Sequence, residues 1–115
     1  MSKTIKAKLV LLKNGKEDKE FFIDSDVINI GRWDPDSGAF PEIDLTNDDV
    51  EAKVSRKHAK ILCKNNQFFL EDLGSLNGCY VNRGSRLVAG EPVPIKDGDE
   101  IILGKVFFKF YVLDK

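Results

Sequence analysis

The fragment Ser55-Arg56-Lys57-His58 places a hydroxyl, two cations and the only histidine of the chain in four consecutive positions. A serine close to a histidine could form a nucleophile with its general base. However, the chain has no G-x-S-x-G elbow, because Gly74-Ser75-Leu76-Asn77-Gly78 has its serine in the second place rather than the third. Since a serine three residues before a histidine is common by chance, we expect no enzymatic activity.

The spacing of potential ligands also argues against a metal site. Cys63, Cys79 and His58 show no C-x-x-C or H-x-x-H pattern. Residues 33–51 contain seven acids and no Lys or Arg, and the first two acids match the first two ligands of an EF-hand loop. The pattern then fails at the required glycine and at the last glutamate. We therefore expect neither a metal nor a cofactor.

The acidic stretch is longer than an ordinary turn. Its two prolines and one glycine interrupt regular structure, and loops above about 12–15 residues are usually functional or disordered. We expect residues 33–54 to form a long acidic surface insertion to one side of any binding site, with a short strand at 42–45.

Binding of an anion is a further possibility for the serine-histidine fragment. Three polar, turn-like segments come at the ends of expected strands: Gly31-Arg32, 55–58 and 74–78. Arginine offers a planar fork of donors for phosphate, serine adds a hydroxyl, and amides in a turn can form an anion nest. Taken alone, each segment is equally compatible with an ordinary solvated turn, so spacing leaves the question open.

The elements that would position these segments are predicted to be strands. Ile5, Ala7, Leu9 and Leu11 alternate with lysines, and similar short apolar runs recur along the chain without a helical stripe. Turn signals separate the runs at intervals of about ten residues, which favours an all-β sandwich or barrel. The expected strands are 5–12, 20–23, 27–30, 59–63, 68–72, 79–82, 86–88, 100–103 and 106–113.

Composition narrows the class of protein. The 115 residues, 42% hydrophobic with eight Phe, suggest one domain with a real core, and a net charge of −1 argues against general binding of nucleic acid. No apolar stretch approaches the roughly 20 residues that span a bilayer, and the N-terminus does not resemble a signal peptide. We interpret the two cysteines as buried thiols, in keeping with a cytoplasmic protein.

The three polar segments together resemble those of forkhead-associated (FHA) domains, a family that binds phosphothreonine peptides. The resemblance spans residues 5–113 and includes the motif 72–78 with Val81 and Asn82, followed by Leu87, Gly90, Val93, Ile95, Gly98-Asp99, Ile101 and Gly104. It implies a single FHA domain, 1–115, that belongs to a larger protein. The implied fold is a two-sheet β-sandwich of about eleven strands with its binding loops at one end.

The resemblance also implies residue roles and partners. The implied phosphate ligands are Arg32, Ser55 and Arg56, the peptide contacts are Asn77, Lys53 and Ser75, and Gly31, His58 and Gly78 support the site. The partner would be a phosphothreonine protein, with a Ser/Thr kinase upstream and the isolated domain monomeric. Alternatively, an FHA-fold assembly domain can bind its partner independently of phosphorylation.

The chain departs from the family pattern at three places. The segment between Arg32 and Ser55 has 22 residues, which is longer than is usual in the family. Leu76 stands where some members have a hydroxyl that touches the phosphate. Cys79 stands where threonine is usual.

Overall fold

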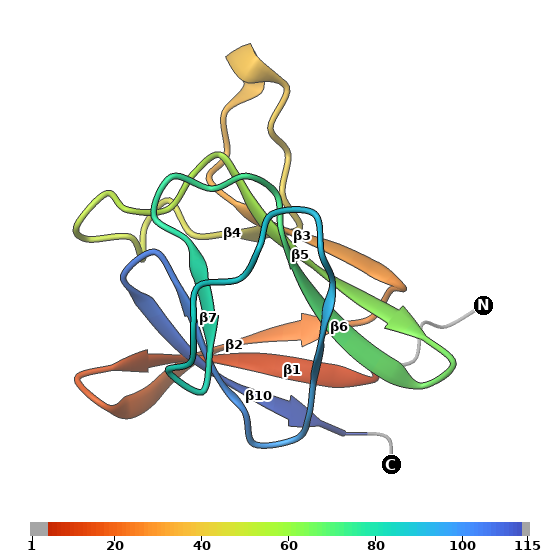
Figure 1. Ribbon diagram of the computed structural model, residues 1–115. Coiled ribbons are helices and arrows are strands. Elements are labelled where there is room, and N and C mark those ends of the chain that lie inside the picture. Colours follow the sequence, from red (N-terminus) through yellow and green to blue (C-terminus); the bar gives the residue numbers. More distant parts are fainter. Residues whose placement is uncertain (1–4, 114–115) are drawn as a thin grey trace.

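The computed structural model describes residues 5–113 and is a two-layer β-sandwich (Figure 1). One five-stranded sheet has the order β2-β1-β10-β9-β7, and the other has the order β4-β3-β5-β6-β8. Neighbouring strands are antiparallel, except that β3 and β4 are parallel. The strands are β1 (Ala7–Lys13), β2 (Lys16–Ile23), β3 (Val27–Gly31), β4 (Ile43–Asp44), β5 (Lys57–Lys64), β6 (Gln67–Asp72), β7 (Cys79–Val81), β8 (Val93–Ile95), β9 (Glu100–Leu103) and β10 (Val106–Val112).

Two tight hairpins fix the register of the long strands. Asn14 and Gly15 join β1 to β2 with φ values of 55° and 77°, and Asn65 and Asn66 join β5 to β6 with 53° and 64°. Positive φ at both central residues matches the twist of antiparallel strands, and asparagine and glycine adopt it readily. The turn residues therefore set which strand faces lie inward.

Phenylalanines from both sheets fill the space between the layers. Phe108 and Phe110 of β10 are fully buried, and the ring of Phe110 meets Phe68 of β6 edge to face with centroids 5.3 Å apart. Phe21 of β2 packs on Phe108 from within its own sheet. The Phe68–Phe110 contact thus joins the two sheets across the core. Truncating a buried phenylalanine to alanine typically costs about 3–5 kcal/mol.

The predicted β-sandwich is confirmed, but residues 5–113 contain ten strands rather than about eleven. The strand expected at 86–88 is wrong. Leu87 makes a single backbone bond, to the Cys79 carbonyl at 3.0 Å, and no ladder follows. Asn82 and Arg83 both have positive φ, so the chain turns away from β7 at that point.

The acidic segment is only partly the surface insertion that we expected. The short strand predicted at 42–45 is confirmed as β4, and an excursion containing the 3-10 turn η1 (Pro35–Ser37) projects from the sandwich in gold in Figure 1. Nevertheless, Ala39, Ile43 and Leu45 are buried. The segment therefore contributes to the core, because apolar residues alternate with its acids.

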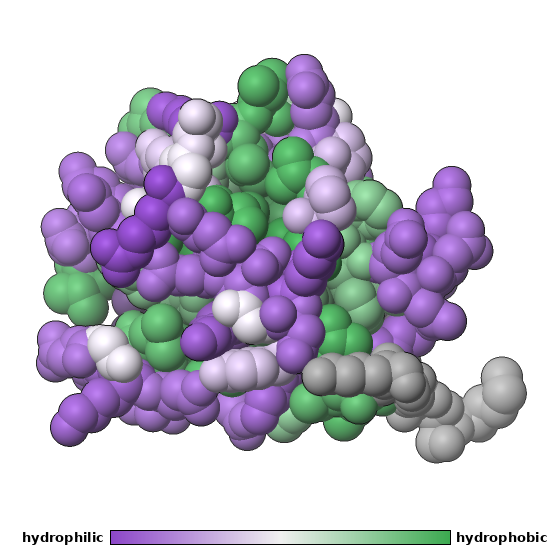
Figure 2. Space-filling model, turned by 60° about the horizontal axis from the view of Figure 1, so that its bottom comes forward, coloured by the Kyte–Doolittle hydropathy of each residue, from purple (hydrophilic) through white to green (hydrophobic). Residues whose placement is uncertain are grey.

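The surface is predominantly polar on the side turned forward in Figure 2, with smaller hydrophobic areas between hydrophilic ones. On β1, the ammonium of Lys8 pairs with Glu20 of β2 and lies 5.5 Å from the ring centroid of Tyr111 on β10. Lysine stems and such pairs cover apolar atoms while keeping charge in water. Within residues 5–113, no helix is long and apolar enough to cross a membrane.

Candidate functional site

Three loops come together at the upper end of the sandwich in Figure 1, after β3, before β5 and between β6 and β7. Gly31, at the end of β3, lies against the loop before β5, and a Cβ there would be 1.9 Å from the Arg56 carbonyl oxygen. The amide of Arg32 donates to that same oxygen at 3.1 Å. Only glycine permits this approach, so Gly31 lets Arg32 and Ser55 sit in adjoining loops.

His58 joins two of these loops from inside the sandwich. It is fully buried, its Nδ1 accepts from the backbone N–H of Ser55 at 2.9 Å, and its Nε2 lies 2.8 Å from the Gly78 carbonyl oxygen. Nδ1 can accept only if unprotonated, so Nε2 bears the proton and donates to Gly78. Burial lowers the pKa of His58 and outweighs the opposing effect of the Gly78 carbonyl. The imidazole is therefore a neutral bridge.

This geometry does not fit a nucleophile with its base. His58 contacts the backbone N–H of Ser55, whereas the Ser55 hydroxyl oxygen accepts from the backbone N–H of Leu76 at 3.1 Å. Both ring nitrogens of His58 are engaged in fixing backbone. That His58 supports a binding site stays a prediction of the sequence resemblance.

The half-buried side chain of Arg32 keeps part of its donor set available. Its Nε donates to the carbonyl oxygen of Val54 at 2.6 Å, which orients the guanidinium. Among residues 5–113, the two terminal nitrogens have no partner. Beside it, the Ser55 hydroxyl accepts one hydrogen bond and retains its own proton. Arg32 and Ser55 thus supply unused donors from adjoining loops.

Asn77 and Ser75, which were both predicted to contact the peptide, differ in whether they keep hydrogen-bonding groups available. Asn77 donates through Nδ2 to the carbonyl oxygen of Lys53 at 3.1 Å, which keeps its Oδ1 available. Ser75 is only 5% exposed, and its hydroxyl donates to Asp72 and accepts from the Gly78 amide at 3.0 Å. The structure therefore places Ser75 in the support of the loop, although the resemblance implied a contact with peptide.

Arg56 is exposed but already has an anionic partner. Its Nε lies 2.8 Å from a carboxylate oxygen of Asp34. Asp34 belongs to the acidic segment, so the expectation that this segment lies to one side of the site is wrong. Lys53 and Lys57 flank the same loop and are exposed, and the described part of the chain shows no ion pair for either.

Two carboxylates with no predicted role organise the loops. Asp72 accepts from the amides of Gly74 and Ser75, from the Ser75 hydroxyl and from the Cys79 thiol. Burial opposes its ionisation, but the bonds from Ser75 and Cys79 outweigh burial and lower its pKa. Asp49 accepts from the amides of Lys53 and of Val54 at 2.8 and 2.9 Å.

A third supporting residue is Arg86. Its Nη2 donates to the carbonyl oxygens of Ser75 and Leu76, at 2.8 and 3.2 Å. An aspartate shortly before Gly-Ser is a signal for a side-chain-capped turn. By contrast, no local pattern reveals Arg86, which reaches the loop from ten residues away.

His58, Asp72 and Cys79 bring potential metal-ligand atoms within 4.8 Å of one another. The atoms are engaged by protein groups, however, since Cys79 Sγ donates to Asp72 at 3.1 Å and His58 bridges Ser55 and Gly78. Burial, followed by the bond to Asp72, raises the pKa of the Cys79 thiol. Because a metal would bind the thiolate, we interpret the cluster as a hydrogen-bonded support.

Comparison with known proteins identifies the family of the chain. Over 102 residues the chain is 37% identical to the glycogen accumulation regulator GarA of Mycobacterium tuberculosis, covering 86% of this chain and 53% of the relative. The chain thus spans about half the length of that relative.

Two solved structures share the fold. EmbR of Mycobacterium tuberculosis, in complex with a low-affinity phosphopeptide, has 26% identity and a TM-score of 0.75, covering 96% of this chain and 25% of EmbR. The FHA domain of the Chlamydia trachomatis protein CT664 has 29% identity and a TM-score of 0.73, covering 92% and 96% of the two chains. The profile of the FHA domain matches residues 28–104. The chain therefore belongs to the FHA domain family.

Proposed function

We propose that this domain binds phosphothreonine peptides and so mediates protein–protein interactions that depend on phosphorylation. The observation that supports this most directly is the pairing of Arg32 and Ser55, which hold unused donors in adjoining, braced loops. A phosphate at pH 7 carries about −1.5 to −2 charges and three acceptor oxygens. The terminal nitrogens of Arg32 and the Ser55 proton suit those oxygens.

The remaining roles follow from the same loops. Asn77 keeps its carbonyl oxygen free to accept from a peptide amide after the phosphothreonine, because only its amide nitrogen is bound to Lys53. Lys53 is available for an acidic peptide residue further along. Arg56 joins the phosphate site when the ligand competes with Asp34.

The wider setting is part of the proposal. GarA is named a regulator, and its greater length supports the view that these 115 residues form one domain of a larger protein. The domain would act in the cytoplasm as a monomer without enzymatic activity, downstream of a Ser/Thr kinase. Neither nucleic acid nor membrane would be a ligand.

Isothermal titration with matched peptides tests the proposal. We expect phosphothreonine peptides to bind, and the same sequences with phosphoserine or plain threonine to bind more weakly or not at all. Arg32→Ala removes a hydrogen bond to a charged group, worth roughly 1.5–3 kcal/mol, so affinity should fall about 10–150-fold. Arg83→Ala is the matched control, since Arg83 pairs with Glu100 outside these loops.

Two results would contradict the proposal. One is wild-type phosphopeptide affinity in a folded Arg32→Ala variant. The other is a natural partner whose binding survives treatment with λ-phosphatase, which would favour assembly independent of phosphorylation.

A further inference from the structure

Two large aromatic side chains stand exposed in the acidic segment next to the phosphate site. Trp33 is 54% exposed and Phe40 is 56% exposed, and their rings meet edge to face with centroids 5.0 Å apart. Trp33 directly follows Arg32 in the chain. Aromatic residues are enriched at the centres of protein interfaces, so this pair is a candidate contact surface rather than part of the core.

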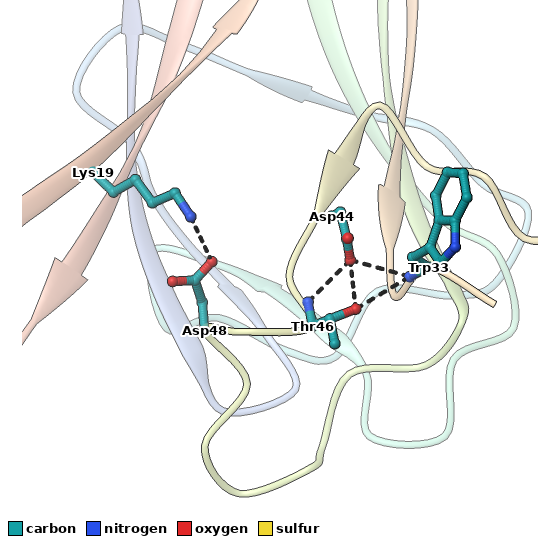
Figure 3. A network of polar contacts seen from close by, with 5 residues as sticks. All are labelled: Lys19, Trp33, Asp44, Thr46 and Asp48. Atoms are coloured by element: carbon teal, nitrogen blue, oxygen red, sulfur yellow. Dashed lines mark hydrogen bonds and ion pairs between the residues drawn. The ribbon is translucent and has the colours of Figure 1, made fainter.

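The pair is held in place before any ligand arrives. Asp34 and Ala39 exchange two backbone hydrogen bonds of 2.9 Å, which close the excursion between the two aromatic residues. Gly38 takes the left-handed conformation at φ 75° that the tight return requires. Figure 3 shows the Trp33 amide donating to the Asp44 carboxylate, at 3.0 Å. A backbone fixed in this way loses little further entropy on binding.

The Asp44 contact is itself reinforced. Thr46 donates to the same carboxylate oxygen through its amide and its hydroxyl, at 3.0 and 2.6 Å (Figure 3). Burial opposes ionisation of Asp44, but the bonds from Thr46 and Trp33 prevail and lower its pKa. The anchor of Trp33 is therefore an ionised carboxylate at neutral pH.

Beside Phe40 lies a hollow of about 330 Å³. Ile30, Phe40, Pro41 and Leu73 give it apolar walls, and Arg56 and Lys57 border it. Arg56 is also one of the residues predicted to bind phosphate, so the hollow and the candidate phosphate site share this side chain. An extended peptide advances about 3.3 Å per residue, and one peptide can therefore reach both places.

We infer that this hollow binds an apolar side chain of the phosphothreonine peptide, at a position before the phosphothreonine. The inference rests on the proposed function. Asn77 and Lys53, assigned to residues after the phosphothreonine, contact each other and do not line the hollow, whereas Arg56 does. The apolar walls favour Leu, Ile or Phe, and Asp34 beside Arg56 disfavours an acid.

Oriented peptide libraries with one fixed phosphothreonine test the inference. We expect selection of Leu, Ile or Phe at one position on the amino-terminal side. Replacing that residue by alanine in a single selected peptide should weaken binding about five- to tenfold, as expected for partial burial of one such side chain. Trp33 is the only tryptophan, so its fluorescence should change more with the apolar peptide than with the alanine peptide.

Phe40→Ala should abolish the preference for the apolar residue while leaving binding of the alanine peptide unchanged. Phe22→Ala is the matched control, because Phe22 is similarly exposed at 48% but lies on β2 of the other sheet. Phosphothreonine binding with no preference before the phosphothreonine, or with the same preference in Phe40→Ala, would overturn this inference alone. Failure of all phosphothreonine peptides to bind would overturn the proposed function as well.

Discussion

Replacing His58 by alanine should destabilise the domain through two identifiable losses. The Ser55 amide and the Gly78 carbonyl each lose a hydrogen bond partner, and a fully buried ring is replaced by a smaller side chain. A buried polar group without a partner costs about 1–3 kcal/mol. Since solvent can reach the half-exposed Ser55 more easily than Gly78, we expect a total cost of about 2–4 kcal/mol.

Urea unfolding measures this loss. With an m value of about 2 kcal/mol/M, the midpoint should fall by about 1–2 M, and the melting temperature by about 8–16 °C. Lys57→Ala, at the exposed neighbour, should stay within about 0.5 kcal/mol of the wild type. At a temperature where His58→Ala remains folded, phosphopeptide binding should still be weaker, because Ser55 and Gly78 are no longer tied together. An unchanged midpoint would refute the bridging role.

Three further predictions concern charge. Arg32→Lys should weaken phosphopeptide binding although the charge remains, because lysine lacks the planar fork; equal affinity in titration would contradict this. Asp34→Asn should raise affinity up to about fivefold at low salt by releasing Arg56, and an unchanged or lower affinity would exclude competition by Asp34. Because the pKa of His58 is lower in the folded state, the unfolded chain binds the extra proton. The free energy of unfolding should therefore be highest above about pH 6.5. Below that pH it should fall by at most about 1.4 kcal/mol per pH unit. Urea midpoints between pH 7.5 and 5 should show this slope in the wild type and lose it in His58→Ala.

Most of the strands were predictable because a strand has a pattern that is visible in neighbouring residues of the sequence. Alternation in 106–113 and the Asn14-Gly15 turn are properties of neighbouring residues, and both appear as expected in β10 and the first hairpin. The strand expected at 86–88 failed because strand formation also requires a partner, and only Leu87 finds a hydrogen bond to β7. Composition likewise could not show that Ile43 and Leu45, within an acidic stretch, face inward.

The site was predictable where a motif is local and not where contacts span the fold. The roles of Arg32, Ser55 and His58 were implied by the family resemblance of short segments and stay predictions. The ion pair between Asp34 and Arg56 joins residues that only folding brings together. Ser75 illustrates a different difficulty, since a loop serine can face either solvent or the loop interior. Here its hydroxyl faces inward because it donates a hydrogen bond to Asp72.

Because Asp34 pairs with the Nε of Arg56, an anion of a ligand that contacts Arg56 competes with an anion already in place. A carboxylate from a partner brings no more charge than Asp34 already supplies, and it must also give up its own hydration. A phosphate brings about −1.5 to −2 charges and can win that exchange. Aspartate or glutamate placed at a partner's threonine should therefore be a poor substitute for phosphorylation, and partner mutants built on that substitution would report a loss of interaction rather than constant activation.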